Sequence, residues 1–165
     1  MATVSDSIRI DAPKDQVWAV LADFGGILNY NPGISNAYST SDVNSGLGAT
    51  RHCDLLPMGS IEERIIEWNE GSDYLVDIYQ FNGLMPPIKS AQARLSVEAD
   101  GDQSIAHMIM TFEMKMGVIG KAMSTVMLES QYQKAVTGIM QGLKLYVETG
   151  QQGTRDNIKL AFASA

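Results

Sequence analysis

The feature that most constrains this fold is a long stretch without proline near the end of the chain, Gly117–Glu148. Its apolar residues recur at helical spacing, which is typical of an amphipathic helix with one face on a core. At about 100° per residue, its first and second halves do not share one apolar stripe. Either the helix bends near Ser130–Lys134, or its two halves face different partners. Our hypothesis is that the first half faces a cavity and the second half a packed sheet.

The periodicity before this helix changes to two, which is typical of half-buried strands. In the last of these segments, methionines and Phe112 take one face and mostly polar residues take the other, as in an antiparallel sheet covered on a single side. Short breaks between the segments favour antiparallel hairpins. The predicted strands are Thr3–Asp11, Ile34–Thr40, Ala49–Leu55, Ser60–Asn69, Tyr74–Phe81, Ile88–Ala99 and Ser104–Met116.

Two short helices are expected between the first two strands. Asp11-Ala12-Pro13 opens the first helix, Gly25-Gly26 breaks it, and a second short helix or a pair of turns follows. The element order predicts an α+β domain over residues 1–149, with a seven-stranded antiparallel sheet wrapped around the long C-terminal helix. Residues 150–165 are expected to form a mobile tail.

Composition excludes several classes of partner. The net charge of −7 would repel a phosphate backbone and an anionic membrane surface. No window approaches the ~20 apolar residues of a membrane span, and the first residues do not resemble a signal peptide. The single cysteine, Cys53, fits a reducing compartment, so we expect a cytoplasmic location. Two histidines without metal-ligand spacing predict no metal site, and no cofactor is expected.

Four short motifs together resemble the START-like, or SRPBCC, superfamily with its Bet v 1-like helix-grip fold, and most closely its polyketide cyclase/dehydrase-like group. The motifs are Ile10–Trp18, Gly48–Arg51, Glu62–Trp68 and Gly142–Glu148, and the resemblance covers about residues 3–149. It implies a deep, mostly apolar cavity between the sheet and the long helix. The superfamily holds carriers, receptors and enzymes, so the fold alone does not fix an activity.

The resemblance also implies two loops at the mouth of the cavity. Leu55–Gly59, which contains Pro57, matches a shortened form of the loop that closes over the ligand in the distantly related plant abscisic acid receptors. Phe81–Pro87 lies where those receptors have their latch, but lacks their His-Arg-Leu. The receptors' signalling mechanism is therefore not expected here. Tyr30–Ile34 is expected at the rim.

Strand alternation sorts the candidate site residues. If Leu55 faces inward, so do Arg51 and Cys53. If Ile61 and Ile65 face inward, so do Glu63 and Glu67. The receptors' Glu-Arg pair, matched onto residues 63 and 64, also places the glutamate inward. The opposite phase, with Ile66 and Trp68 inside, stays open.

Arg51 and Glu63 have two interpretations. They orient a ligand, with the arginine binding a carboxylate, phosphate or enolate and the glutamate binding a hydroxyl or water. Alternatively, they pair with each other and satisfy two buried charges. His52 and His107 are expected on the outer face. Cys53 is interpreted as a small core residue rather than a nucleophile.

The favoured function is binding of a hydrophobic small molecule, such as a lipid, isoprenoid, quinone or polyketide-like compound. The alternative is a polyketide cyclase or dehydratase with Glu63 as acid/base and Arg51 as oxyanion stabiliser. A structural interaction module with a filled core is a third possibility. The predicted ligand-binding residues are Arg51, Cys53, Leu55, Pro57, Ile61, Glu63, Ile65, Met108, Met110, Phe112, Met127 and Ile139.

Overall fold

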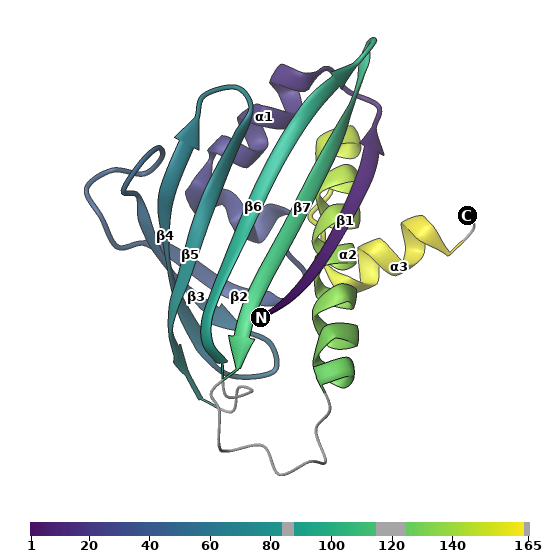
Figure 1. Ribbon diagram of the computed structural model, residues 1–165. Helices are drawn as coiled ribbons and strands as arrows, with labels where there is room; N and C mark the ends of the chain where they lie inside the picture. Colours follow the sequence, from purple (N-terminus) through teal and green to yellow (C-terminus); the bar gives the residue numbers. More distant parts are fainter. Residues whose placement is uncertain (84–87, 115–124, 164–165) are drawn as a thin grey trace.

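The computed structural model of the protein describes residues 1–83, 88–114 and 125–163 (Figure 1). Its helices and strands confirm the predicted α+β class, and each strand begins and ends within a residue or two of its predicted bounds. In chain order the elements are β1 (Ala2–Ile10), α1 (Lys14–Ala22), the 3-10 helix η1 (Phe24–Asn29), β2 (Ile34–Ser39), β3 (Thr50–Leu55), β4 (Ser60–Asn69), β5 (Asp73–Asn82), β6 (Ile88–Asp100), β7 (Gln103–Met114), α2 (Thr125–Thr149) and α3 (Arg155–Phe162).

The seven strands form one sheet in the order β1-β7-β6-β5-β4-β3-β2, and every neighbouring pair is antiparallel. The helix α2 packs against β1 and β7, and α1 packs against β6 and β7. Figure 1 shows α2 running beside β1, with α1 crossing behind the far end of the sheet. The long helix therefore covers one face of the sheet, as in a helix-grip fold.

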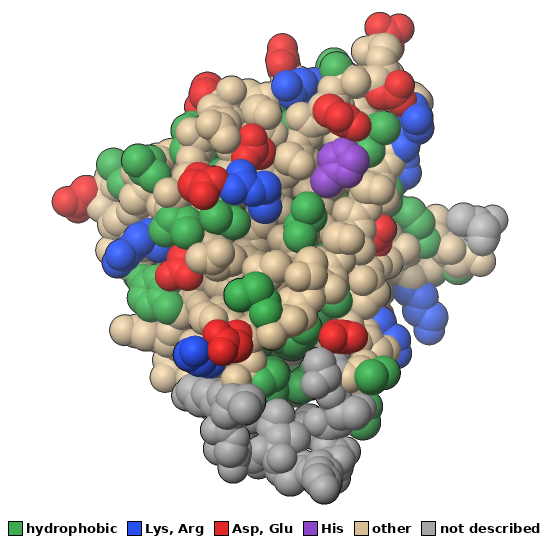
Figure 2. Space-filling view, viewed as in Figure 1, with side chains coloured by type: hydrophobic (Ala, Val, Ile, Leu, Met, Phe, Trp, Pro, Cys, Tyr) green, Lys and Arg blue, Asp and Glu red, His purple; other side chains and the backbone are tan. Residues whose placement is uncertain are grey.

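Alternation along the strands separates a buried face from a wet one. In β7, Ala106, Met108 and Phe112 are buried, whereas Ile109 is 46% exposed on the other face. Acidic and basic side chains are interspersed over the outer face (Figure 2). Several of them pair across strands, including Lys89 with Glu113 at 3.1 Å. Such exposed pairs contribute little stability, so the sheet depends on its inner face.

The helix α2 supplies the other side of the core. Val136, Met140, Leu143 and Val147 are buried at spacings of four, three and four, which gives the apolar stripe expected of the second half of the helix. The predicted first turns, from Gly117, lie outside the described residues. Among the helices that the structure describes, none combines the length and apolar character needed to cross a membrane.

The end of the chain differs from the expected mobile tail, because residues 155–162 form helix α3. The hydroxyl oxygen of Thr154 caps this helix by accepting a hydrogen bond from the Asn157 amide at 3.2 Å. Ile158 is buried, and α3 packs on α2. The preceding residues are tied to η1, since the Gly153 amide donates to the Asn29 carbonyl at 2.8 Å.

A β-bulge in β4 explains why both predicted strand phases were partly right. Glu63 and Ile65 face inward, but the register shifts between Ile65 and Glu67. Glu67 therefore turns outward, contrary to the first phase, and forms an ion pair with Arg94. Trp68 turns inward and stacks on Tyr74 with ring centroids 5.7 Å apart. A bulge inserts one residue and so reverses the alternation beyond it.

Candidate functional site

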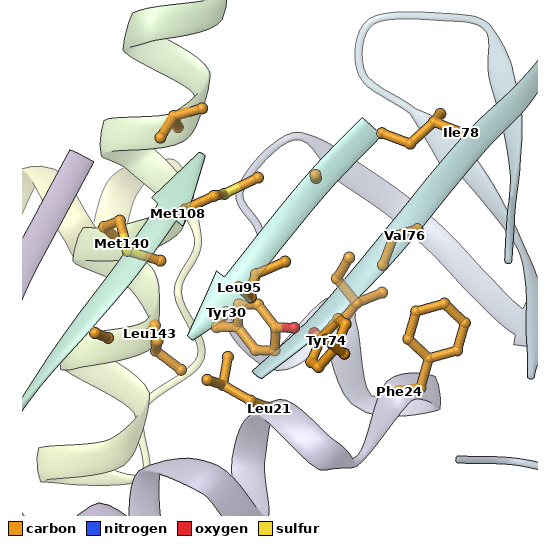
Figure 3. Packing of buried hydrophobic residues seen from close by; sticks show 14 of the residues in the cluster. Leu21, Phe24, Tyr30, Tyr74, Val76, Ile78, Leu95, Met108, Met140 and Leu143 are labelled. Carbon is orange, nitrogen blue, oxygen red and sulfur yellow. The ribbon is translucent and has the colours of Figure 1, made fainter. Parts of the chain in front are cut away.

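A pocket of about 300 Å3 lies between the inner face of the sheet, η1 and α2. Its walls are mainly apolar side chains from β3 to β7, among them Val76, Ile78 and Leu95 (Figure 3). On the helix side it is lined by Tyr132, Ala135 and Ile139. The cavity thus meets the middle of α2.

Seven of the predicted site residues line this pocket: Arg51, Leu55, Ile61, Glu63, Met108, Met110 and Ile139. Their role in binding a ligand stays a prediction.

The other five predicted residues do not line the pocket. Cys53, Ile65 and Phe112 are buried in the core beside it, and the Phe112 ring packs against Tyr132. Pro57 is exposed on its loop, where the neighbouring Leu56 lines the pocket instead. Met127 is 52% exposed near the first described turn of α2. The hypothesis that the first half of the helix faces the cavity is therefore wrong for this residue.

Arg51 and Glu63 form a buried ion pair at one end of the pocket. They lie directly opposite each other on β3 and β4, and Arg51 Nε donates to Glu63 Oε2 at 2.5 Å. Only 3% of the arginine and 6% of the glutamate are exposed. The Cys53 thiol also donates to Glu63 Oε2, at 3.4 Å. The pairing interpretation therefore describes the geometry, although both side chains also border the pocket.

The guanidinium of Arg51 also contacts Phe24 in two ways. It donates to the Phe24 carbonyl oxygen, and its Cζ lies 3.8 Å from the centroid of the Phe24 ring. Burial by itself would lower the pKa of Arg51, but the Glu63 carboxylate, together with smaller contributions from Tyr30, Cys53 and Tyr74, outweighs burial and the pKa is raised. The arginine therefore stays charged and largely neutralised.

Two tyrosine hydroxyls complete this polar end. Tyr30 follows η1 and Tyr74 lies near the start of β5, and Figure 3 shows the Tyr30 oxygen directed toward Tyr74. Neither hydroxyl has a hydrogen-bond partner within the described residues, although they lie near each other and near Arg51. Burial raises the pKa of both phenols, so both stay protonated. An unpaired buried hydroxyl costs about 1–3 kcal/mol, so these groups need an explanation.

Two glycines allow the Tyr30 backbone to approach α2. A Cβ on Gly142 would lie 2.0 Å from the Tyr30 carbonyl oxygen, and a Cβ on Gly153 would lie 3.1 Å from Tyr30 Cα. Only residues without a side chain fit at these two places. The contact between η1, α2 and the segment before α3 therefore fixes the position of the Tyr30 ring.

The two predicted access loops meet near the pocket. A Cβ on Gly83 would lie 2.8 Å from Gly59 Cα, so the loops touch through glycines. The Leu56 amide donates to the Gly33 carbonyl at 2.9 Å, which joins the first loop to the predicted rim. Leu56 and Phe81 line the pocket from these loops. Residues 84–87 of the second loop lie outside the described residues.

The outer-face histidines take no part in this pocket. His52 bonds Glu62 at 2.5 Å and Asp54 at 3.1 Å, and its ring stacks on Tyr38. His107 lies 3.3 Å from Glu98. Within residues 1–83, 88–114 and 125–163, no group of three His, Cys, Asp or Glu side chains could hold a metal ion.

The sequence reasoning missed Tyr74, Tyr132 and Arg155 as pocket-lining residues and placed Tyr30 only at the rim. The alternation of Tyr74 with Val76 and Ile78 was a usable signal, because all three share the inner face. For Arg155 the usable signal was the capping residue before it, which marks the start of α3.

Comparison with solved structures identifies the same fold in other organisms. A START superfamily protein from Mycobacterium smegmatis has a TM-score of 0.74 at 17% identity, covering 90% of this chain and 99% of that one. A protein from Thermus thermophilus has a TM-score of 0.74 at 15% identity, covering 88% and 97%. Ara h 8.0201 has a TM-score of 0.67 at 17% identity, also covering 88% and 97%. At these identities the likeness shows the fold alone.

The sequence comparisons are consistent with this fold. No curated protein matches the sequence. The family model described as "Polyketide cyclase / dehydrase and lipid transport" matches residues 1–148. This match spans every strand, both helices that cover the sheet and the whole polar end of the pocket. The chain therefore belongs to the polyketide cyclase/dehydrase and lipid transport family, with the helix-grip fold of START and Bet v 1-like proteins.

Proposed function

We propose that this protein binds a hydrophobic small molecule in the pocket between its sheet and α2, with a hydroxyl or carbonyl group of the ligand at the buried polar end. Lipids, isoprenoids, quinones and polyketide-like compounds fit this description. The observation that carries the proposal is the pair of buried hydroxyls on Tyr30 and Tyr74, which have no hydrogen-bond partner among the described residues, in a mainly apolar pocket. A ligand with one polar end would supply the missing hydrogen bonds and cover the apolar walls.

The charge balance favours a neutral polar group at this end. Glu63 already neutralises Arg51, so an anion placed there would be attracted by one charge and repelled by the other. Hydroxyl and carbonyl groups avoid this repulsion and can accept from the two phenols. The methionines at 108 and 110 add flexible, polarisable walls that suit ligands of varied shape.

Calorimetric titration with decanol tests the proposal. The wild type should bind decanol, and a double Tyr30→Phe, Tyr74→Phe variant should bind it about five- to thirtyfold more weakly. This factor corresponds to about 1–2 kcal/mol, the scale of one or two hydrogen bonds. The stability of the unliganded double variant should not fall, because the hydroxyls it lacks had no partner in the described residues.

A double Tyr38→Phe, Tyr79→Phe variant is the matched control, since neither ring lines the pocket. It should bind decanol like the wild type. No decanol binding by the wild type, or equal loss in both double variants, would contradict the proposal. Native mass spectrometry of gently purified protein, followed by solvent extraction, would then identify the natural ligand.

The enzyme alternative is a polyketide cyclase or dehydratase in which Glu63 moves a proton and Arg51 stabilises an oxyanion. The family description, which includes polyketide cyclases and dehydrases, favours keeping it. The Glu63→Gln variant separates the two functions. A binder should show a modest change in affinity, whereas an enzyme that depends on this carboxylate should lose turnover of a polyketide-like substrate.

A further inference from the structure

A second hollow, which we call the α2–α3 groove, lies between helices α2 and α3. It has a volume of about 420 Å3 and is formed by α2, α3 and residues 31–33, with Pro32 and Ile158 among its walls. Figure 1 shows α3 leaving α2 on the side away from the sheet. The groove exists only because α3 docks on α2.

The groove is positively charged, although the chain carries a net charge of −7. Its charged lining residues are Lys134, Arg155 and Lys159, and it has no acidic lining residue among those that the structure describes. None of the three has an ion-pair partner in the described parts of the chain. Arg155 and Lys159 stand four residues apart and so share one face of α3. Three unpaired cations facing one hollow provide a site for an anion.

The groove and the internal pocket are neighbours. Asn31, Gly33, Ala135 and Arg155 line both of them. Arg155 is therefore at the junction, with the apolar pocket on one side and the two lysines on the other. A molecule that extends from one hollow into the other would pass this guanidinium.

We propose that the α2–α3 groove binds the anionic head group, a carboxylate or a phosphate, of an amphipathic ligand whose apolar chain lies in the internal pocket. This inference rests on the proposed function and adds the charge and the orientation of the ligand. The buried polar end of the pocket does not favour an anion, because the Glu63 carboxylate lies beside Arg51 there. The groove has the same kind of cation without a carboxylate among its described lining residues, and Arg155 can bind a carboxylate or phosphate through two parallel hydrogen bonds.

The experiment compares decanoate with decanol on the full chain. The test variant carries Lys134→Gln, Arg155→Gln and Lys159→Gln. The control variant carries Lys14→Gln, Arg64→Gln and Lys89→Gln, which changes the net charge equally but leaves the groove intact.

We expect the test variant to bind decanoate about tenfold more weakly at low salt, since each exposed ion pair is worth a factor of up to about five. Its affinity for decanol should change less than about twofold. The control variant should match the wild type for both ligands. Added salt should lower the affinity of the wild type for decanoate but not its affinity for decanol.

Several results would overturn the inference. An unchanged decanoate affinity in the test variant would remove the groove from the site. If only the Tyr30→Phe, Tyr74→Phe variant loses affinity for decanoate, the anion lies at the buried polar end of the pocket instead. Inorganic phosphate that binds the wild type as tightly as decyl phosphate does would indicate a site for free anions.

Two further arms separate this inference from its alternatives. If the test variant loses binding to phosphatidylserine vesicles but keeps its decanoate affinity, the groove serves a membrane surface and the inference is wrong. If the wild type does not bind decanol, the proposed function itself is contradicted. If the wild type binds decanol and the test variant keeps its decanoate affinity, only the proposed role of the groove is contradicted.

Discussion

Replacing Gly142 by alanine should destabilise the protein and disturb its site, whereas the same change at Gly138 should not. Both glycines lie in α2, so both substitutions gain the same helix propensity, about 0.5–1 kcal/mol. Their surroundings differ. A Cβ at position 142 would lie 2.0 Å from the Tyr30 carbonyl oxygen and 3.0 Å from its carbon, whereas a Cβ at position 138 would meet only Pro32 Cγ, at 3.3 Å.

The size of the destabilisation by Gly142→Ala depends on which atoms must move to make room for the new Cβ. Backbone cannot rotate away as a side chain does, so Tyr30 would have to shift by about 1 Å to reach ordinary contact distances. Overpacking of this kind costs about 1–3 kcal/mol. Because the helix gain cancels between the two variants, Gly142→Ala should be about 2 kcal/mol less stable than Gly138→Ala. For a chain of this length the difference corresponds to roughly 4–8 °C in Tm.

Thermal and urea unfolding measure the stability, and decanol titration reports on the site. Gly142→Ala should bind decanol more weakly, because the ring of Tyr30 moves with its backbone. Gly138→Ala should bind it like the wild type. If Gly142→Ala is as stable as Gly138→Ala, the close approach of η1 to α2 is not as described, and the position of Tyr30 loses its explanation.

Three other predictions concern the groups around the pocket. Arg51→Met alone should cost about 3–5 kcal/mol by leaving Glu63 buried and unpaired, and adding Glu63→Met should recover much of that loss in urea unfolding. Burial raises the pKa of Cys53, so a thiol reagent should label it only when the chain unfolds; rapid labelling of the native state would contradict its burial. Hydrogen bonds that the His52 ring donates to Glu62 and to a second carboxylate raise the pKa of His52, so its stabilising contribution is complete below about pH 6.5 and is lost as pH rises through the folded-state pKa. His52→Gln should therefore destabilise the protein at about pH 5.5 and have less effect at about pH 9; equal effects at both would be inconsistent with a raised pKa.

Much of the fold was predictable because its signals are local. A period of two identified all seven strands, and a period of 3.6 identified the long helix. The same alternation correctly turned Arg51 and Glu63 inward, since Arg51 lies in β3 and Glu63 precedes the register shift between Ile65 and Glu67 in β4. Their contact with each other follows from a cross-strand register that strand alternation alone does not specify.

The remaining features depend on contacts between distant parts of the chain. The bulge after Ile65 reverses the alternation, and no single residue there announces it. The helix α3 is short, and its apolar residues at 158, 160 and 162 resemble a weak strand more than a helix. It is held by Ile158 packing on α2 and by the hydrogen bond from Gly153 to Asn29, which a sequence does not show.

In the site, too, local features were predictable from the sequence and contacts between distant segments were not. Inward-facing residues of single strands were predictable, whereas the position of Tyr30 near Tyr74 depends on the close approach of η1 to α2 that Gly142 allows. Met127 was misplaced because the helical spacing gives a face but not which neighbour covers it. That side chain is 52% exposed and does not line the pocket.

Methionine methyl NMR can locate the hydrophobic ligand that we propose for the pocket between the sheet and α2. Met108 and Met110 line the pocket, whereas Met1 is 94% exposed at the start of β1 and serves as the control. On addition of decanol, the methyl signals of Met108 and Met110 should shift and show contacts to the ligand chain, and the signal of Met1 should stay unchanged. Shifts confined to exposed methionines, with those two signals unmoved, would contradict binding in this pocket.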